Sequence, residues 1–219
     1  MTPELANTMS MISRAKQNYE DKKPTPQDSF VDVSKLDPSR PTVVMDMDET
    51  MIKAFTEADE EFYDVKPPKY MELNLRMILN YKSKGTKHGV KVIFRPYLFD
   101  ILDFLSLEYN LVVYTAGMQE YAEPIIDAIE AETKYFQARL YRQHCTKVNG
   151  QYLKDLKLIA KDGISLEKMV LLDNSMFCFS LNLNNGIPIP DFTGLEEDEE
   201  NEDQELVFAS QFIENLFKS

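Results

Sequence analysis

Residues 43–50, VVMDMDET, constrain the fold of this chain more than any other stretch. With Thr42 before them, the first three form a short apolar run rich in β-branched residues, typical of a strand buried on both faces of a sheet. Acidic residues follow at once. Asp46 and Asp48 are two residues apart, so in an extended chain they project to the same side while Met47 points away. The pattern therefore predicts two carboxylates that share one pocket.

Two later apolar runs also end in polar groups. Residues 111–114 (LVVY) run into Thr115, and residues 169–172 (MVLL) run into Asp173 and Asn174. Between the runs lie segments with helical spacing of apolar residues, and strands that alternate with helices indicate an α/β fold with a mainly parallel sheet. Ligands of such sheets bind outside the carboxyl ends of the strands. All three runs are thus expected to deliver polar groups to one edge.

The remaining elements are weaker signals. Helical spacing predicts helices near residues 7–19, 98–107, 118–132, 156–161 and 205–217. Further strands are expected at residues 135–141 and near 187–189, and alternating polarity predicts a half-exposed hairpin between Tyr70 and Phe94. The domain organisation expected is a loosely held N-terminal arm (1–38) and one domain (39–219) that carries a β insertion at about 66–94 and an acidic loop at 196–205.

The charge is unevenly distributed along the chain. Residues 66–95 hold eight Lys or Arg and one acid, whereas 196–205 hold eight acids and no base. Two interpretations of the basic insertion stay open: a basic wall that attracts an acidic, phosphorylated segment at long range, or lysines that merely alternate with a buried hairpin face. The acidic run is typical of a solvated loop.

Composition excludes several classes of protein. The net charge of -13 argues against a general nucleic-acid binder, because a phosphate backbone requires clustered basic residues. No apolar run is long enough to span a bilayer, and the two cysteines suggest neither a zinc site nor a disulfide framework. A soluble protein of the nucleus, the cytoplasm or both is expected. His88 and His144 are expected at the surface rather than as metal ligands.

The polar groups at the predicted edge suit phosphoryl chemistry. Two carboxylates this close favour a shared proton or a hard divalent cation, and oxygen ligands from Asp46, Asp173 and Asn174 select Mg²⁺ over zinc. The Thr115 hydroxyl and the Lys154 ammonium could balance the oxygens of a phosphoryl group. One carboxylate could act as nucleophile and the other as proton shuttle. The alternative is that Asp48 or Thr50 caps a helix after the strand.

Residues 46–50, DMDET, resemble the DxDxT signature of haloacid-dehalogenase-like phosphatases, in the form typical of the branch with the small C-terminal-domain phosphatases. The chain is similar to FCP/SCP-like (NLI-interacting-factor-like) protein serine/threonine phosphatases over about residues 40–192. Six further blocks match in order: 94–96 (FRP), 112–116 (VVYTA), 121–124 (YAEP), 138–142 (ARLYR), 152–156 (YLKDL) and 171–175 (LLDNS). The chain departs from the branch at residues 143–147 and at Phe192, where relatives carry Trp.

The resemblance implies a Rossmann-like core with a small β insertion beside the active site. It implies Asp46 as nucleophile on phosphoserine or phosphothreonine, Asp48 as general acid and base, and Thr115 and Lys154 as phosphate-binding residues. Mg²⁺ would be held by Asp46, the Asp48 carbonyl and Asn174. Asp173 would adjust the electrostatic environment of the metal or of Lys154 from close by. Tyr121 and Arg142 match substrate-binding positions.

The substrate that the resemblance implies is the C-terminal repeat domain of RNA polymerase II. Two alternatives stay open: a catalytically idle phosphopeptide-binding scaffold, and a small-metabolite phosphatase of the same superfamily.

Overall fold

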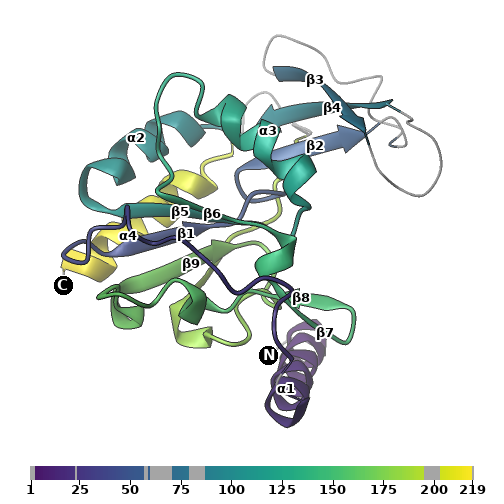
Figure 1. The fold of residues 1–219 in the computed structure, drawn as a ribbon, viewed down its shortest axis with the longest axis vertical. Helices are drawn as coiled ribbons and strands as arrows, with labels where there is room; N and C mark the ends of the chain where they lie inside the picture. Colours follow the sequence, from purple (N-terminus) through teal and green to yellow (C-terminus); the bar gives the residue numbers. More distant parts are fainter. Residues whose placement is uncertain are drawn as a thin grey trace.

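The computed structural model describes residues 3–22, 24–56, 59, 71–78, 87–194 and 203–218 (Figure 1). Its centre is a five-stranded parallel sheet in the order β10-β9-β1-β5-β6. The strands are β1 (Thr42–Met45), β5 (Asn110–Tyr114), β6 (Ala138–Leu140), β9 (Met169–Asp173) and β10 (Gly186–Pro188). The predicted α/β fold with a parallel sheet is confirmed.

The three central strands are buried on both faces, as their apolar sequences predict. Successive side chains of a strand point to opposite faces, so β1 contributes Val43 and Met45 to one core and Val44 to the other. The register places Met45 beside Val113 of β5 and Leu172 of β9. The residues after β1, β5 and β9 therefore emerge side by side at one edge.

Three helices cover the first face of the sheet: α2 (Leu98–Glu108), α3 (Gln119–Ile129) and α4 (Glu205–Lys218). Each buries apolar residues at helical spacing, for example Leu98, Ile101, Leu102 and Leu105 of α2. The three predicted helices are present with slightly different ends.

The second face is covered by shorter elements. The 3₁₀ turns are η2 (Arg142–His144), η3 (Leu156–Leu158), η4 (Leu166–Lys168) and η5 (Leu183–Asn185), and β7 (Thr146–Val148) pairs with β8 (Gln151–Leu153) as a hairpin. The helix expected at 156–161 is only the 3₁₀ turn η3. Leu156, Ile159 and Phe179 pack here against β1, β5 and β9.

A second sheet lies to one side of the first (Figure 1). It pairs β2 (Ile52–Thr56), β4 (Lys87–Phe94) and β3 (Met71–Ile78) antiparallel in the order β2-β4-β3. The predicted hairpin corresponds to β3 and β4, and β2 adds a strand that the sequence pattern did not predict. Lys82 and Lys84 of the proposed basic wall lie outside the described residues, as does most of the acidic run.

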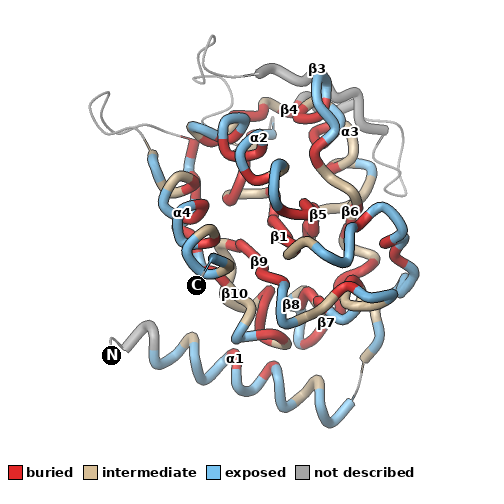
Figure 2. Tube along the Cα trace, turned by 90° about the vertical axis from the view of Figure 1, so that its left-hand side faces the viewer, coloured by how far each residue is buried: buried red, intermediate tan, exposed pale blue. Residues whose placement is uncertain are grey.

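The N-terminal segment packs more closely than an arm of residues 1–38 implies. Val31, Val33 and Leu36 are buried in the second core, so the boundary at residue 38 does not separate packed from unpacked chain. Helix α1 (Pro3–Lys22) contacts β7 and buries Ile12 and Ala15. Figure 2 shows α1 along one side of the body with most of its length exposed.

His144 is buried, which corrects the expectation of a surface residue. Its Nδ1 accepts a hydrogen bond of 2.9 Å from the backbone N–H of Tyr141. Burial lowers the pKa of His144 below its ordinary value of 6.5, and the Asp28 carboxylate, 3.8 Å from Nε2, opposes this shift. The ring therefore stays neutral in the folded chain at a pH where an unfolded histidine takes up a proton.

We expect this histidine to make the protein less stable in mild acid. Because the folded pKa is lowered, the stabilisation is complete above the unfolded pKa and is lost as the pH falls through it towards the folded pKa. His144→Asn keeps an acceptor for the Tyr141 N–H but does not titrate. Between about pH 7.5 and about pH 5.5 its denaturation midpoint should fall less than that of the wild type. An equal fall in both proteins would contradict the assignment.

Candidate active site

The polar groups that follow the central strands converge on one cavity, as the sequence predicts. Asp46 and Asp48 follow β1, Thr115 follows β5, and Asp173 and Asn174 lie at the end of β9. All five line a cavity of about 450 Å³. Its other walls come from Ala116, Gly117, Met118, Tyr121, Arg142, Gln151, Tyr152, Ser175 and Cys178.

The chain turns sharply after β1, which keeps both carboxylates in the cavity. Met47 is fully buried on the core side, and its carbonyl accepts hydrogen bonds from the backbone N–H groups of Met51 (2.9 Å) and Ile52 (3.1 Å). Glu49 adopts a left-handed conformation with φ of 60°. The chain then continues into β2 and not into a helix, so the alternative in which Asp48 or Thr50 caps a helix is wrong.

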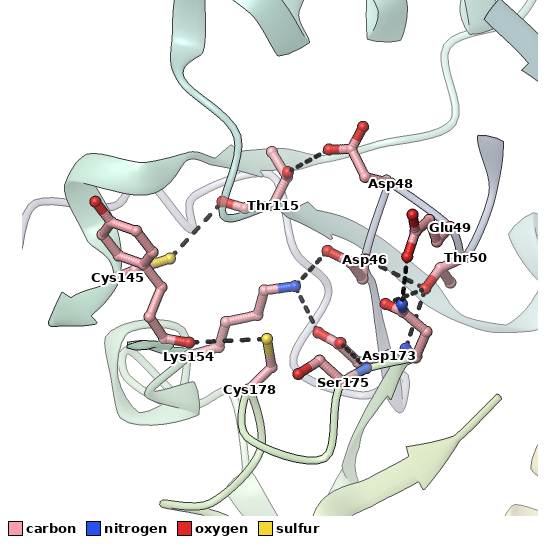
Figure 3. A network of polar contacts seen from close by, with 12 residues as sticks. Asp46, Asp48, Glu49, Thr50, Thr115, Cys145, Lys154, Asp173, Ser175 and Cys178 are labelled. Atoms are coloured by element: carbon pink, nitrogen blue, oxygen red, sulfur yellow. Dashed lines mark hydrogen bonds and ion pairs between the residues drawn. The ribbon is translucent and has the colours of Figure 1, made fainter. Parts of the chain in front are cut away.

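Lys154 lies between two carboxylates (Figure 3). Its Nζ is 2.5 Å from Asp46 Oδ1 and 2.6 Å from Asp173 Oδ2. Asp173 is fixed in turn, because its Oδ1 accepts a hydrogen bond of 2.8 Å from the backbone N–H of Ser175. Lys154 itself is fully buried and does not line the cavity. Seen from the cavity, Lys154 thus lies behind Asp46. Asp173 holds the Lys154 ammonium in place through its ion pair.

Burial and charge oppose each other in this cluster. Burial raises the pKa of Asp46, and the Lys154 ammonium works against that rise. Burial also disfavours the charge on Lys154, but the carboxylates of Asp173 and Asp46 raise its pKa well above the ordinary value. Lys154 therefore favours its protonated form, and the ionisation of Asp46 depends on the Lys154 ammonium beside it.

Asp48 is held by two hydroxyl groups. Tyr121 donates a hydrogen bond of 2.5 Å to Asp48 Oδ1, and Thr115 donates one of 3.4 Å to Oδ2. Burial raises the pKa of Asp48, while the Tyr121 hydrogen bond opposes the shift. Sequence comparison suggested a substrate-facing role for Tyr121; the structure also places its hydroxyl directly on the second carboxylate.

Arg142 forms part of the cavity wall with Tyr152. Its Nε donates a hydrogen bond of 2.6 Å to the carbonyl of Ala116, and its guanidinium lies 5.1 Å from the centre of the Tyr152 ring. These contacts fix the guanidinium end of the side chain beside the loop that carries Thr115. The placement suits a cationic group beside a substrate that enters the cavity.

The oxygens near Asn174 suit a hard cation. The Thr50 hydroxyl lies 3.1 Å from Asp46 Oδ2 and 3.4 Å from Asn174 Oδ1. The Asp46 and Asn174 oxygens therefore both lie close to the same hydroxyl group. Among the described residues no three His, Cys, Asp or Glu side chains form a metal-binding group. A cation here would depend on a carboxylate, an amide oxygen and a backbone carbonyl, a donor set that fits Mg²⁺ with water ligands.

Sequence reasoning missed the role of Arg95, which it counted with the basic insertion. Arg95 is fully buried at the end of β4. Its Nη1 donates to the carbonyl of Thr50 (3.1 Å), its Nη2 donates to that of Pro190 (3.0 Å), and Asp203 lies 2.9 Å away. Through these contacts Arg95 connects the turn after β1 to the segment that precedes α4. Its only sequence signal was its place in the FRP block.

The sequence profile of NLI interacting factor-like phosphatases matches residues 41–219. The chain belongs to this family. It is 32% identical over 158 residues to the carboxy-terminal domain RNA polymerase II polypeptide A small phosphatase 2 of Mus musculus, covering 72% of this chain and 52% of the relative. It is 28% identical to a probable C-terminal domain small phosphatase of Dictyostelium discoideum, covering 81% and 51%. The chain thus spans about half the length of these relatives.

Two solved structures share the fold of this chain. The structure of Fcp1, an essential RNA polymerase II CTD phosphatase, has a TM-score of 0.54 at 24% identity and covers 80% of this chain and 50% of that chain. Fission yeast Fcp1 bound to beryllium fluoride has a TM-score of 0.53 at 18% identity, covering 83% and 51%. These likenesses support the fold. No helix in the described part of this chain is both long and apolar enough to cross a bilayer.

Proposed function

We propose that this chain is a Mg²⁺-dependent phosphoprotein phosphatase that hydrolyses phosphoserine and phosphothreonine through an aspartyl phosphate on Asp46. The observation that carries the proposal is the position of Asp46. Its carboxylate lies at the end of the central strand on the wall of the cavity, 2.5 Å from a fully buried ammonium and beside a second carboxylate.

Asp46 and Asp48 divide the chemistry between them. A carboxylate oxygen of Asp46 attacks phosphorus, and the bond from phosphorus to the serine or threonine oxygen breaks. Asp48 gives its proton to that leaving oxygen. In the second step Asp48 takes a proton from water as the water oxygen attacks phosphorus. Inorganic phosphate leaves, and Asp46 returns as a carboxylate.

The surrounding residues position these two groups. The Tyr121 and Thr115 hydroxyls hold Asp48 by both oxygens, and burial makes Asp48 easier to protonate, as a general acid requires. Lys154, fixed by Asp173, balances the negative charge that gathers around Asp46 during transfer. Thr115 lines the cavity beside Asp48, where its hydroxyl can contact phosphoryl oxygens.

Asp46, the Asp48 carbonyl and Asn174 would hold the Mg²⁺ ion. Bound there, the ion supplies Lewis-acid stabilisation of the charge on the phosphoryl oxygens. Asp173 has both oxygens engaged, with Lys154 and with the Ser175 N–H, which favours the positioning role over that of a ligand.

The cavity favours a phosphorylated side chain on a peptide. Arg142 and Tyr152 provide a cationic and aromatic wall beside Thr115. The mouse and Dictyostelium relatives are named as phosphatases of a C-terminal domain, which makes phosphorylated repeats of RNA polymerase II the substrate that we propose to test first.

We expect phosphate release to depend strictly on Mg²⁺. Protein treated with EDTA should release almost no phosphate from p-nitrophenyl phosphate or from singly phosphorylated peptides of the RNA polymerase II repeat. Added Mg²⁺ should restore the rate, because the hard oxygen donors of the site suit such an ion. Unrelated phosphopeptides serve as the comparison for substrate choice. Binding of phosphopeptides without any release in Mg²⁺ would instead support the idle scaffold.

A further inference from the structure

The orientation of the Asn174 amide decides whether this residue can hold a cation. A carboxamide has an oxygen and an NH₂ group of nearly the same size, and only the oxygen can bind a metal. If the amide turned by half a revolution, the NH₂ group would face the cation. Contacts that exclude that orientation would therefore favour cation binding.

Two carboxylates contact the nitrogen side of this amide. Asn174 Nδ2 donates to Asp191 Oδ1 at 2.9 Å and lies 3.4 Å from Glu49 Oε2. Ionised carboxylates only accept hydrogen bonds, so the NH₂ group must face them. Oδ1 is then left on the side of the Thr50 hydroxyl, which is also bonded to Asp46.

Both carboxylates are held in place by neighbouring contacts. Lys53 pairs with Glu49 Oε1 at 2.7 Å, and Glu49 keeps its left-handed backbone conformation. The backbone N–H of Phe192 donates to the Glu49 carbonyl at 2.8 Å, and the Pro190 carbonyl accepts from Arg95. The two neighbours of Asp191 in the chain, Pro190 and Phe192, are thus both held by hydrogen bonds. Figure 3 shows Glu49 next to Thr50 on the Asp46 side of the site.

We propose that Asp191, assisted by Glu49, is a positioning residue that fixes the Asn174 amide so that its oxygen faces the bound Mg²⁺. This rests on the proposed function, because it concerns the same metal site. It also gives a role to Glu49, whose carboxylate lies 3.4 Å from the same amide nitrogen. Hydrogen-bonding partners that orient a metal ligand commonly change metal affinity by about 10–100-fold when they are removed.

The alternative explanation for any effect of Asp191 is its charge, which attracts cations at long range. Asp191 is exposed, so salt screens this attraction. Asp191→Asn separates the two effects. Its side-chain oxygen can still accept the hydrogen bond from Asn174, but it carries no charge. Asp191→Ala removes both.

The test is direct titration of Mg²⁺ into metal-free protein by calorimetry, in moderate salt and without substrate. Asp191→Ala should bind Mg²⁺ about tenfold more weakly than the wild type, whereas Asp191→Asn should remain close to it. Asp162→Asn, at an exposed position where asparagine tolerates the left-handed backbone, is the control and should bind like the wild type. The melting temperature in EDTA should be the same for all four proteins.

Four results would overturn the inference. Wild-type affinity in Asp191→Ala would show that the amide needs no such support, and equal weakening in Asp191→Asn would show that charge alone matters. If Asp191→Ala melted at a lower temperature than the wild type in EDTA, and this loss of stability accounted for the weaker binding, Asp191 would have only a structural role. A wild-type protein that binds no Mg²⁺ would contradict the proposed function as well as this inference. If the wild type binds Mg²⁺ and releases phosphate, and Asp191→Ala binds Mg²⁺ equally well, only this inference is wrong.

Discussion

Asp46→Asn is expected to slow phosphate release by about 10⁴-fold or more, a loss of about 5 kcal/mol of transition-state stabilisation. The amide has nearly the same shape as the carboxylate and can still accept a hydrogen bond from Thr50. It is a very poor nucleophile, however, so no aspartyl phosphate can form. The measurement is the initial rate of phosphate release from p-nitrophenyl phosphate and from a phosphoserine peptide in Mg²⁺.

The control for this variant is Asp162→Asn, which makes the same chemical change at an exposed position outside the cavity. It should retain the wild-type rate. Phosphopeptide binding should persist in Asp46→Asn, because Thr115 and Arg142 remain. If Asp46→Asn turned over substrate within tenfold of the wild type, Asp46 would not be the nucleophile.

Lys154→Met is expected to impair both stability and catalysis. The change leaves the Asp46 and Asp173 carboxylates buried without the ammonium that lies within 2.6 Å of each. Removing one partner from a buried ion pair typically costs about 3–5 kcal/mol, which for a chain of this size corresponds to a fall in melting temperature of roughly 6–20 °C. The rate should fall by about 10²–10³-fold, because the charge on the transferred group loses its balancing cation.

Lys157→Met is the matched control, since it removes an exposed lysine three residues later in the chain. Its melting temperature and rate should stay close to those of the wild type. To separate catalysis from unfolding, the rate of Lys154→Met is measured well below its melting temperature. A variant that melts and turns over like the wild type would mean that Lys154 does not balance Asp46.

The sequence predicted the central part of the site because that part is encoded locally. Asp46 and Asp48 follow their strand directly, and Thr115 and Asp173 follow theirs, so the strand pattern alone placed them at one edge. Lys154 was expected near the site, but its burial between Asp46 and Asp173 depends on contacts with residues 108 and 19 positions away. No local pattern specifies such a pairing.

The elements that sequence reasoning missed depend on non-local packing. Strand β2 is short, and its sequence does not alternate regularly between apolar and polar residues. It forms because it pairs with β4, about forty residues later in the chain. His144 looked like a surface residue because nothing near it in sequence indicates the N-terminal segment that covers it. Arg95 looked like one more basic residue of the insertion, although its partners lie in the turn after β1 and before α4.

The most direct test of this account is chemical trapping of the covalent intermediate. Sodium borohydride reduces an aspartyl phosphate to homoserine, whereas it leaves a free carboxylate unchanged. Wild-type protein quenched during turnover of p-nitrophenyl phosphate in Mg²⁺, reduced and analysed by peptide mass spectrometry should show homoserine at position 46, and Asp46→Asn should show none. Active wild-type protein in which position 46 stays unmodified, or in which the label lies at Asp48 instead, would show that Asp46 is not the nucleophile.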